Sequence, residues 1–192
     1  VDTDLASEKR SGTGRHPLPD PNTFSEKLSH WGMSNSKQVV VYDDAGGAFA
    51  GRLWWMLKWL GHEAVAVLDG GLNSWVKGGN KLVTTTTVFE KAHFEPCVQE
   101  NMIATVDDVE EAQFKMNTIL LDARSKERYQ GINDPLDPIP GHEPGAISHP
   151  LGINLDKTAK FRTKEDLRHN FNKISNDMKD KEIISMCGSG IT

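Results

Sequence analysis

The chain has 192 residues, 26% of them charged, and a formal net charge of −5. This length is enough for one large domain or two small ones with a buried core. The slightly acidic balance predicts no nucleic-acid partner, because DNA- and RNA-binding surfaces are rich in Lys and Arg.

The first half of the chain alternates predicted helices and strands. Residues 1–38 are polar and rich in turn residues, and a short helix is expected from Phe24 to Trp31 after an N-cap at Asn22 or Thr23. The elements expected next are a strand at residues 38–44, a helix at 48–60, a strand at 64–69 and a helix at 72–77. Both strands are continuous apolar runs, which are typical of strands buried in a parallel sheet. This order predicts an α/β unit.

The second half repeats this order after a break. Residues 82–101 have no sustained periodicity and are predicted to be a linker. The elements expected after it are a helix at 105–114, a strand at 118–124, a Pro/Gly-rich loop at 131–150, a helix at 164–171 and a strand at 183–186. The sequence therefore predicts an N-terminal domain at residues 1–81 and a C-terminal domain at 102–192. Because the chain starts at Val1 and stops within a loop, both domains are expected to be incomplete pieces of a longer protein.

The apolar runs and the cysteines indicate the cellular location to expect. The apolar runs are short and carry charges, so no membrane partner is expected. Cys97 and Cys187 have no paired spacing and do not form a disulfide framework. A reducing compartment, the cytoplasm, is therefore the expected location.

The last predicted strand delivers Cys187 into a small loop. The residues that follow are Gly188, Ser189, Gly190, Ile191 and Thr192. Both glycines allow positive φ, so the loop can turn its backbone N–H groups toward the sulfur, where they would stabilise a thiolate. Cys187 is thus a candidate nucleophile. The alternative is that Cys187 is a small buried residue followed by an ordinary turn.

Several motifs resemble the tandem-domain rhodaneses. In the first half they are Val-Val-Val-Tyr-Asp-Asp-Ala-Gly-Gly (39–47), Arg-Leu-Trp-Trp (52–55), Gly-His (61–62) and Leu-Asp-Gly-Gly-Leu-Asn-Ser-Trp (68–75). In the second half they are Leu-Asp-Ala-Arg (121–124), Arg-Tyr (128–129), Gly-His-Glu-Pro-Gly-Ala (141–146) and Cys-Gly-Ser-Gly-Ile-Thr (187–192). Together they cover most of the chain in the family's order.

The resemblance implies an α/β fold with two rhodanese-like domains, each a parallel sheet flanked by helices, of which only the second is catalytic. It also implies a sulfurtransferase: the Cys187 thiolate takes sulfur from 3-mercaptopyruvate or thiosulfate, holds it as a persulfide and passes it to a thiol, cyanide or a thioredoxin-like acceptor. No cofactor and no metal are expected, because sulfur is transferred directly.

The loop after Cys187 resembles that of the 3-mercaptopyruvate sulfurtransferases, whereas thiosulfate-preferring members resemble Cys-Arg-Lys-Gly. In the first subgroup a serine, an aspartate and a histidine are proposed to form a proton relay. The matching positions are Ser189, Asp4 and His16, and Asp2 competes with Asp4 for its place.

Arginines are expected to hold the donor, because a guanidinium suits a two-oxygen anion. Arg128 matches the family's substrate-binding arginine, and Arg15 is placed at the same cleft by analogy. The loop residues expected to contribute backbone groups are Gly188, Gly190, Ile191 and Thr192. Residues 133–138 lack a second arginine that some members have, so both donors stay candidates.

Other motif residues are predicted to be structural. Arg124 is expected to form an ion pair, and Asp122 and His142 to hold loops. Two alternatives for the whole chain stay open: a non-catalytic rhodanese-like binding module, and a Cys-x5-Arg phosphatase of the same fold. The phosphatase motif usually has a histidine before its cysteine, where this chain has Met186.

Overall fold

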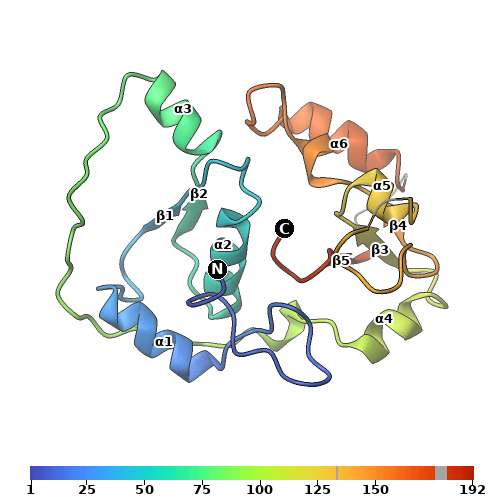
Figure 1. The fold of residues 1–192 in the computed structure, drawn as a ribbon, viewed down its shortest axis with the longest axis horizontal. Helices are drawn as coiled ribbons and strands as arrows, with labels where there is room; N and C mark the ends of the chain where they lie inside the picture. Colours follow the sequence, from blue (N-terminus) through green and yellow to red (C-terminus); the bar gives the residue numbers. More distant parts are fainter. Residues whose placement is uncertain (133, 176–180) are drawn as a thin grey trace. The chain divides into compact units, whose positions relative to one another are not determined.

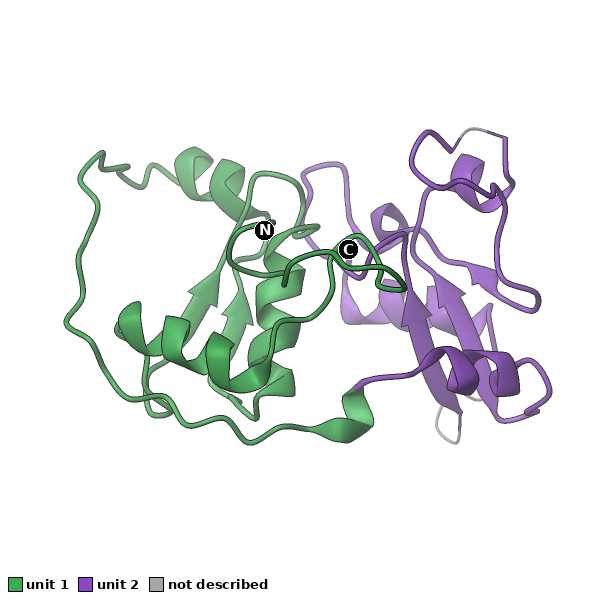
Figure 2. Cartoon of the chain, turned by 60° about the horizontal axis from the view of Figure 1, so that its bottom comes forward, with its two compact units in different colours: residues 1–102, 191 green, residues 103–190, 192 purple. Residues whose placement is uncertain are grey.

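The computed structural model describes residues 1–132, 134–175 and 181–192, and the chain divides into two compact units. Unit 1 comprises Val1–Met102 and Ile191, and unit 2 comprises Ile103–Gly190 and Thr192 (Figure 2). Each unit combines parallel strands with helices (Figure 1). The predicted α/β class is therefore confirmed.

Unit 1 is a small parallel sheet covered by helices. Its elements are α1 (Pro21–His30), β1 (Val39–Val41), α2 (Ala50–Trp59), β2 (Val65–Val67), α3 (Gly71–Lys77) and the 3-10 helix η1 (Glu100–Met102). β1 pairs in parallel with β2, and α2 packs against both strands. The core is apolar and consists of Phe24, Leu28, Met33, Met56, Leu57, Trp59, Leu60 and Phe94.

Helix α1 begins earlier than the sequence pattern predicts. Its N-cap is Asp20, whose carboxylate accepts a hydrogen bond from the Thr23 N–H at 2.9 Å, and Pro21 occupies the first turn. Proline is well suited to this position because its missing N–H would be unpaired there anyway. The N-cap predicted at Asn22 or Thr23 is therefore wrong, since the Asp-Pro pair before it provides a better start.

The strands are less buried than their apolar sequences predict. In unit 1, the side chain of Val40 is 53% exposed and Ala66 opposite it in β2 is also exposed. In unit 2, Ile183 of β5 (Glu182–Met186) is 42% exposed. The expectation of strands buried on both faces is therefore wrong for β1 and β2, in which one face stays accessible. It holds for the strand at Thr118–Asp122 of unit 2, which is buried from Ile119 to Asp122.

The segment predicted to be a linker packs in part against unit 1. Phe94 is only 2% exposed and its N–H donates to the Ser29 hydroxyl at 3.0 Å. The Cys97 N–H donates to the Leu60 carbonyl at 3.0 Å. The close approach requires glycine at position 61, since a Cβ there would lie 2.7 Å from the Cys97 carbonyl oxygen.

Unit 2 has a parallel sheet with strand order β4-β3-β5. Its elements are α4 (Val106–Ala112), β3 (Thr118–Asp122), α5 (Lys126–Tyr129), β4 (Ile147–Ser148), the 3-10 helix η2 (Leu151–Asn154), α6 (Lys164–Asn172) and β5 (Glu182–Met186). Helix α4 begins with a capping box, in which Thr105 and Asp108 satisfy each other's backbone N–H groups. The central strand β3 provides the core residue Leu120, which packs with Ala112 and Ala146.

Candidate active site

The carboxyl ends of β3 and β5 bring the predicted site residues of unit 2 to one edge of the sheet. Asp122 lies opposite Met186 in the parallel register, and the Ala123 N–H donates to the Met186 carbonyl at 2.8 Å. Cys187 follows Met186 directly. The thiol therefore lies where parallel strands end, the usual position of ligand sites in open α/β sheets.

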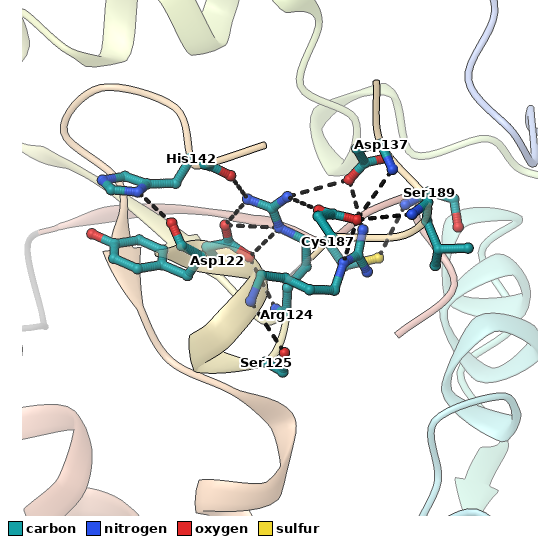
Figure 3. A network of polar contacts seen from close by, with 12 residues as sticks. Asp122, Arg124, Ser125, Asp137, His142, Cys187 and Ser189 are labelled. Atoms are coloured by element: carbon teal, nitrogen blue, oxygen red, sulfur yellow. Dashed lines mark hydrogen bonds and ion pairs between the residues drawn. The ribbon is translucent and has the colours of Figure 1, made fainter. Parts of the chain in front are cut away.

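The loop directs backbone N–H groups at the Cys187 sulfur. The N–H groups of Gly190 and Ser189 lie 3.1 Å and 3.5 Å from Sγ, and Figure 3 shows Cys187 beside Ser189. Gly190 has the predicted positive φ of 72°. Gly188 is not among the described glycines with positive φ, so a single left-handed residue is enough for this turn.

Two other residues of the loop, Ile191 and Thr192, were predicted to bind the donor through their backbone, and this stays a prediction. Within the described residues, no hydrogen bond joins the N–H of Ile191 or Thr192 to the Cys187 sulfur. Cys187 is half-buried, and both it and the exposed Cys97 are free thiols. The loop thus offers a reachable sulfur with two N–H groups aimed at it.

Unit 1 has a comparable loop in which a carboxylate replaces the thiol. Asp43 follows β1, and its Oδ1 accepts hydrogen bonds from the N–H groups of Ala45 (2.9 Å) and Gly47 (2.8 Å). Its Oδ2 accepts from Phe49 (2.9 Å) and Ala50 (2.8 Å) at the start of α2. This loop shows that a strand-to-helix turn of this fold gathers N–H groups around an anion.

The hydrogen bonds at Asp43 determine its ionisation. Burial alone would raise the pKa of Asp43, but the four N–H groups, led by that of Ala50, outweigh burial and lower the pKa below its usual value. A carboxyl whose pKa is lower in the folded state stabilises the fold above its unfolded-state pKa, and this contribution is lost as pH falls through the folded-state pKa.

Asp43→Asn is therefore expected to lower the free energy of unfolding by about 2 kcal/mol at neutral pH, because an amide nitrogen replaces one charged acceptor. Urea unfolding monitored by tryptophan fluorescence measures the change. The difference from wild type should shrink when the pH is lowered below about 4. Asp44→Asn, at the exposed neighbouring position, is the matched control; an equal loss there would refute the role of Asp43.

A buried ion pair lies at the end of β3. The Arg124 guanidinium donates to Asp122 through Nε at 3.0 Å and Nη2 at 2.7 Å, and Nη2 also donates to the Gly141 carbonyl at 2.6 Å. The Asp122 side chain is fully buried and that of Arg124 is 7% exposed. The hydrogen bond and charge of Asp122 raise the pKa of Arg124. The predicted structural ion pair of Arg124 is confirmed.

Arg128, the predicted donor-binding residue, is held by two carboxylates of the same unit. Its Nη2 donates to Asp137 Oδ2 at 2.6 Å, and its Nε lies 3.1 Å from Asp134 Oδ1. Asp137 also lies 3.3 Å from Arg124 Nη1. The two arginines and three carboxylates therefore form one network at the end of β3.

His142 holds the loop before β4, as predicted. Its ring stacks on Tyr129 with centroids 3.7 Å apart, and its Nδ1 lies 2.7 Å from the Tyr129 carbonyl. The Tyr129 hydroxyl donates to the Ala146 carbonyl at 2.7 Å. These contacts join α5 to the loop that carries Gly141.

In unit 1, the histidine of the predicted proton relay contacts a different aspartate from the one predicted. His16 Nε2 lies 2.9 Å from Asp2 Oδ1, whereas Asp4 is paired with Lys27 at 2.9 Å, which lowers the pKa of Asp4. The structure thus gives His16 the alternative partner, Asp2. Arg52, 4% exposed, fixes this segment by donating to the His16 carbonyl at 3.1 Å.

Arg15 and His16 belong to unit 1, and Ser189 and Arg128 to unit 2. Arg15 is half-buried next to His16. Within the described ranges, no group of three or more His, Cys, Asp or Glu side chains could hold a metal ion. Among the helices of those same ranges, none has the length and apolar character needed to cross a membrane.

Sequence reasoning missed two acidic groups of these loops. The prediction includes Asp43 and Asp44 only as the last residues of the strand at 38–44, although an Asp just before two glycines at a strand end is the available signal. The contacts of Arg128 with residues 134 and 137 could not be predicted from periodicity in the sequence, because they form where a loop folds back on α5. Asn133 of the segment examined for a second arginine lies outside the described residues.

Comparison with known proteins identifies the family. The rhodanese-like domain family matches residues 6–78. The whole chain is 37% identical to a probable 3-mercaptopyruvate sulfurtransferase of Pseudomonas aeruginosa and covers 68% of it. It is 31% identical to the thiosulfate sulfurtransferase of Bos taurus, with 91% of this chain and 60% of that protein covered.

A solved structure agrees with the sequence relatives. The crystal structure of SseA from Escherichia coli matches with a TM-score of 0.85 and 30% identity. SseA is a 3-mercaptopyruvate sulfotransferase with the rhodanese fold. The match covers all of this chain and 71% of SseA. The chain thus spans about two thirds of the length of the relatives it matches. The predicted fold and the predicted class, sulfurtransferase, are confirmed, and the chain belongs to the tandem-domain rhodanese family.

Proposed function

We propose that this protein transfers sulfur through a persulfide on Cys187. The observation that carries the proposal is the position of the thiol: it lies half-buried at the end of β5, with the N–H groups of Gly190 and Ser189 directed at its sulfur. These donors stabilise negative charge on the thiolate and on the outer sulfur of a persulfide.

The first half-reaction loads the sulfur. With thiosulfate, the Cys187 thiolate attacks the outer sulfur, the bond to the sulfite sulfur breaks with its electron pair, and sulfite leaves. With 3-mercaptopyruvate, the thiolate attacks the mercapto sulfur, the carbon–sulfur bond breaks, and its electron pair forms the enolate of pyruvate, which takes the thiol proton. Either donor leaves one sulfur on Cys187.

The second half-reaction returns the thiolate. An acceptor thiolate, or cyanide, attacks the outer sulfur of the persulfide, and the electron pair of the sulfur–sulfur bond returns to Cys187. The proposed acceptors are a small thiol, cyanide or a thioredoxin-like protein. Both cysteines are free, which suits the proposed cytoplasmic, reducing location.

Neighbouring residues would serve binding and charge stabilisation. The Ser189 hydroxyl would donate to the donor's carbonyl as enolate charge develops. Arg128 would bind the donor's anionic group. The backbone of Gly188, Ile191 and Thr192 is proposed to complete the pocket around the donor. From unit 1, the roles of His16 and Arg15 stay predictions based on the resemblance, with Asp2, which contacts His16, proposed in place of Asp4.

Intact-mass measurement tests the proposal. The full-length protein incubated with either donor, without acceptor, is expected to gain the mass of one sulfur atom, and peptide mapping should place it on Cys187. A thiol added afterwards should remove the added mass. No gain with either donor, or sulfur only on Cys97, would reject the persulfide mechanism and favour a non-catalytic binding module.

A further inference from the structure

The guanidinium that is proposed to bind the donor already has an anionic partner. Arg128 Nη2 donates to Asp137 Oδ2 at 2.6 Å, which is a short, charge-assisted hydrogen bond. We propose that Asp137 is a specificity-determining residue: it occupies Arg128 in the donor-free protein and sets how tightly an anionic donor binds. This inference rests on the proposed function.

Of the two carboxylates at Arg128, Asp137 is the one that can yield. The Asp134 side chain is fully buried, and its Oδ1 accepts the N–H groups of Leu136 and Asp137, each at 3.1 Å. Burial would raise the pKa of Asp134, but these N–H groups and Arg128 lower it to about 2. Asp134 is therefore a fixed anion. The side chain of Asp137 is 19% exposed, so solvent can replace Arg128 as its partner.

The charges of the network require this displacement. Arg124 and Arg128 carry two positive charges, whereas the three carboxylates of Asp122, Asp134 and Asp137 carry three negative ones. An anionic donor that approached Arg128 with Asp137 in place would add to an excess of negative charge. Donor binding and the Asp137–Arg128 contact are thus alternatives for the same Nη2 group.

The network is placed where it can act on the transferred sulfur. Arg124 is the second residue after β3, and the end of β3 is paired with the strand that delivers Cys187. Asp137 lies 3.3 Å from Arg124 Nη1 and so can keep one cationic partner when it leaves Arg128. Figure 3 shows Asp137, Cys187 and Ser189 at one end of the network and His142 at the other.

The test measures thiosulfate affinity directly. Isothermal titration uses the full-length protein with Cys187→Ser, so that thiosulfate binds without reacting. Adding Asp137→Asn is expected to lower the Kd about tenfold, because the neutral amide competes less well for the guanidinium. Asp137→Glu, which keeps the negative charge, should have a Kd for thiosulfate close to that of the Cys187→Ser parent. Glu110→Gln, which removes one charge from an exposed position on α4, should also leave the Kd unchanged.

A double-mutant cycle shows whether Asp137 acts through Arg128. On an Arg128→Gln background, Asp137→Asn should give no gain in affinity. In the protein with its cysteine intact, Asp137→Asn should lower KM while kcat changes little. An unchanged Kd, or an equal gain without Arg128, would overturn the inference. If Cys187 acquires sulfur but Asp137→Asn has no effect, only this inference fails; if Cys187 never acquires sulfur, the proposed function fails.

Discussion

Replacing Cys187 with serine is expected to reduce sulfur transfer from both donors by at least about a thousandfold, the scale of loss when a covalent nucleophile is removed. A serine hydroxyl is far less acidic than a thiol and cannot store the transferred atom as a persulfide. Two N–H groups, those of Ser189 and Gly190, would remain in the loop without the sulfur they face. Steady-state assays of pyruvate release and of thiocyanate formation measure the two donor reactions.

The matched control for this substitution is the second cysteine. Cys97 is exposed, and its sulfur is contacted by the Gln99 side chain at 3.6 Å. Cys97→Ser should keep wild-type turnover with either donor. Comparable loss in both variants, or residual activity in Cys187→Ser above a few per cent of wild type, would contradict the assigned role of Cys187.

Arg124→Met is expected to lower the free energy of unfolding by about 3–5 kcal/mol, the largest stability change among the proposed variants. Methionine keeps much of the apolar stem but leaves the Asp122 carboxylate, which is fully buried, without its charged partner. The Gly141 carbonyl would lose a 2.6 Å hydrogen bond as well. Thermal and urea unfolding at neutral pH measure the loss.

Arg168→Met on α6 is the control, because Arg168 is exposed and its replacement removes the same charge. That variant should unfold within about 0.5 kcal/mol of wild type. Equal stability of Arg124→Met and wild type would show that the ion pair adds nothing to the fold.

The sequence predicts elements well where local patterns are strong. Apolar runs identify β1 and β3, and the β3 run places Arg124 just beyond the strand. The strands predicted at 38–44, 64–69 and 118–124 are longer than the observed β1, β2 and β3, because the residues at their ends belong to the turns that follow: the run at 38–44 pairs only over Val39–Val41. The family motifs also single out Cys187, whose loop geometry agrees with the expected stabilisation of a thiolate.

Contacts between distant residues could not be predicted in the same way. Phe94 is an isolated apolar residue without periodicity, yet it is buried in the core of unit 1. The choice between Asp2 and Asp4 as the partner of His16 depends on Arg52 and Lys27, which lie far along the chain. The contact of Arg128 with Asp137 depends on how a loop returns to α5, and single-sequence patterns carry no signal for such a return.

The carboxylate of Asp43 prevents dissolved anions from binding to the N–H groups of its own loop. A covalently attached group reaches its own N–H groups at an effective concentration far above that of dissolved sulfate or phosphate. The unit 1 loop, with four such contacts, is therefore saturated by its own side chain and closed to competitors. Even a large excess of thiosulfate or 3-mercaptopyruvate should therefore not bind at this turn.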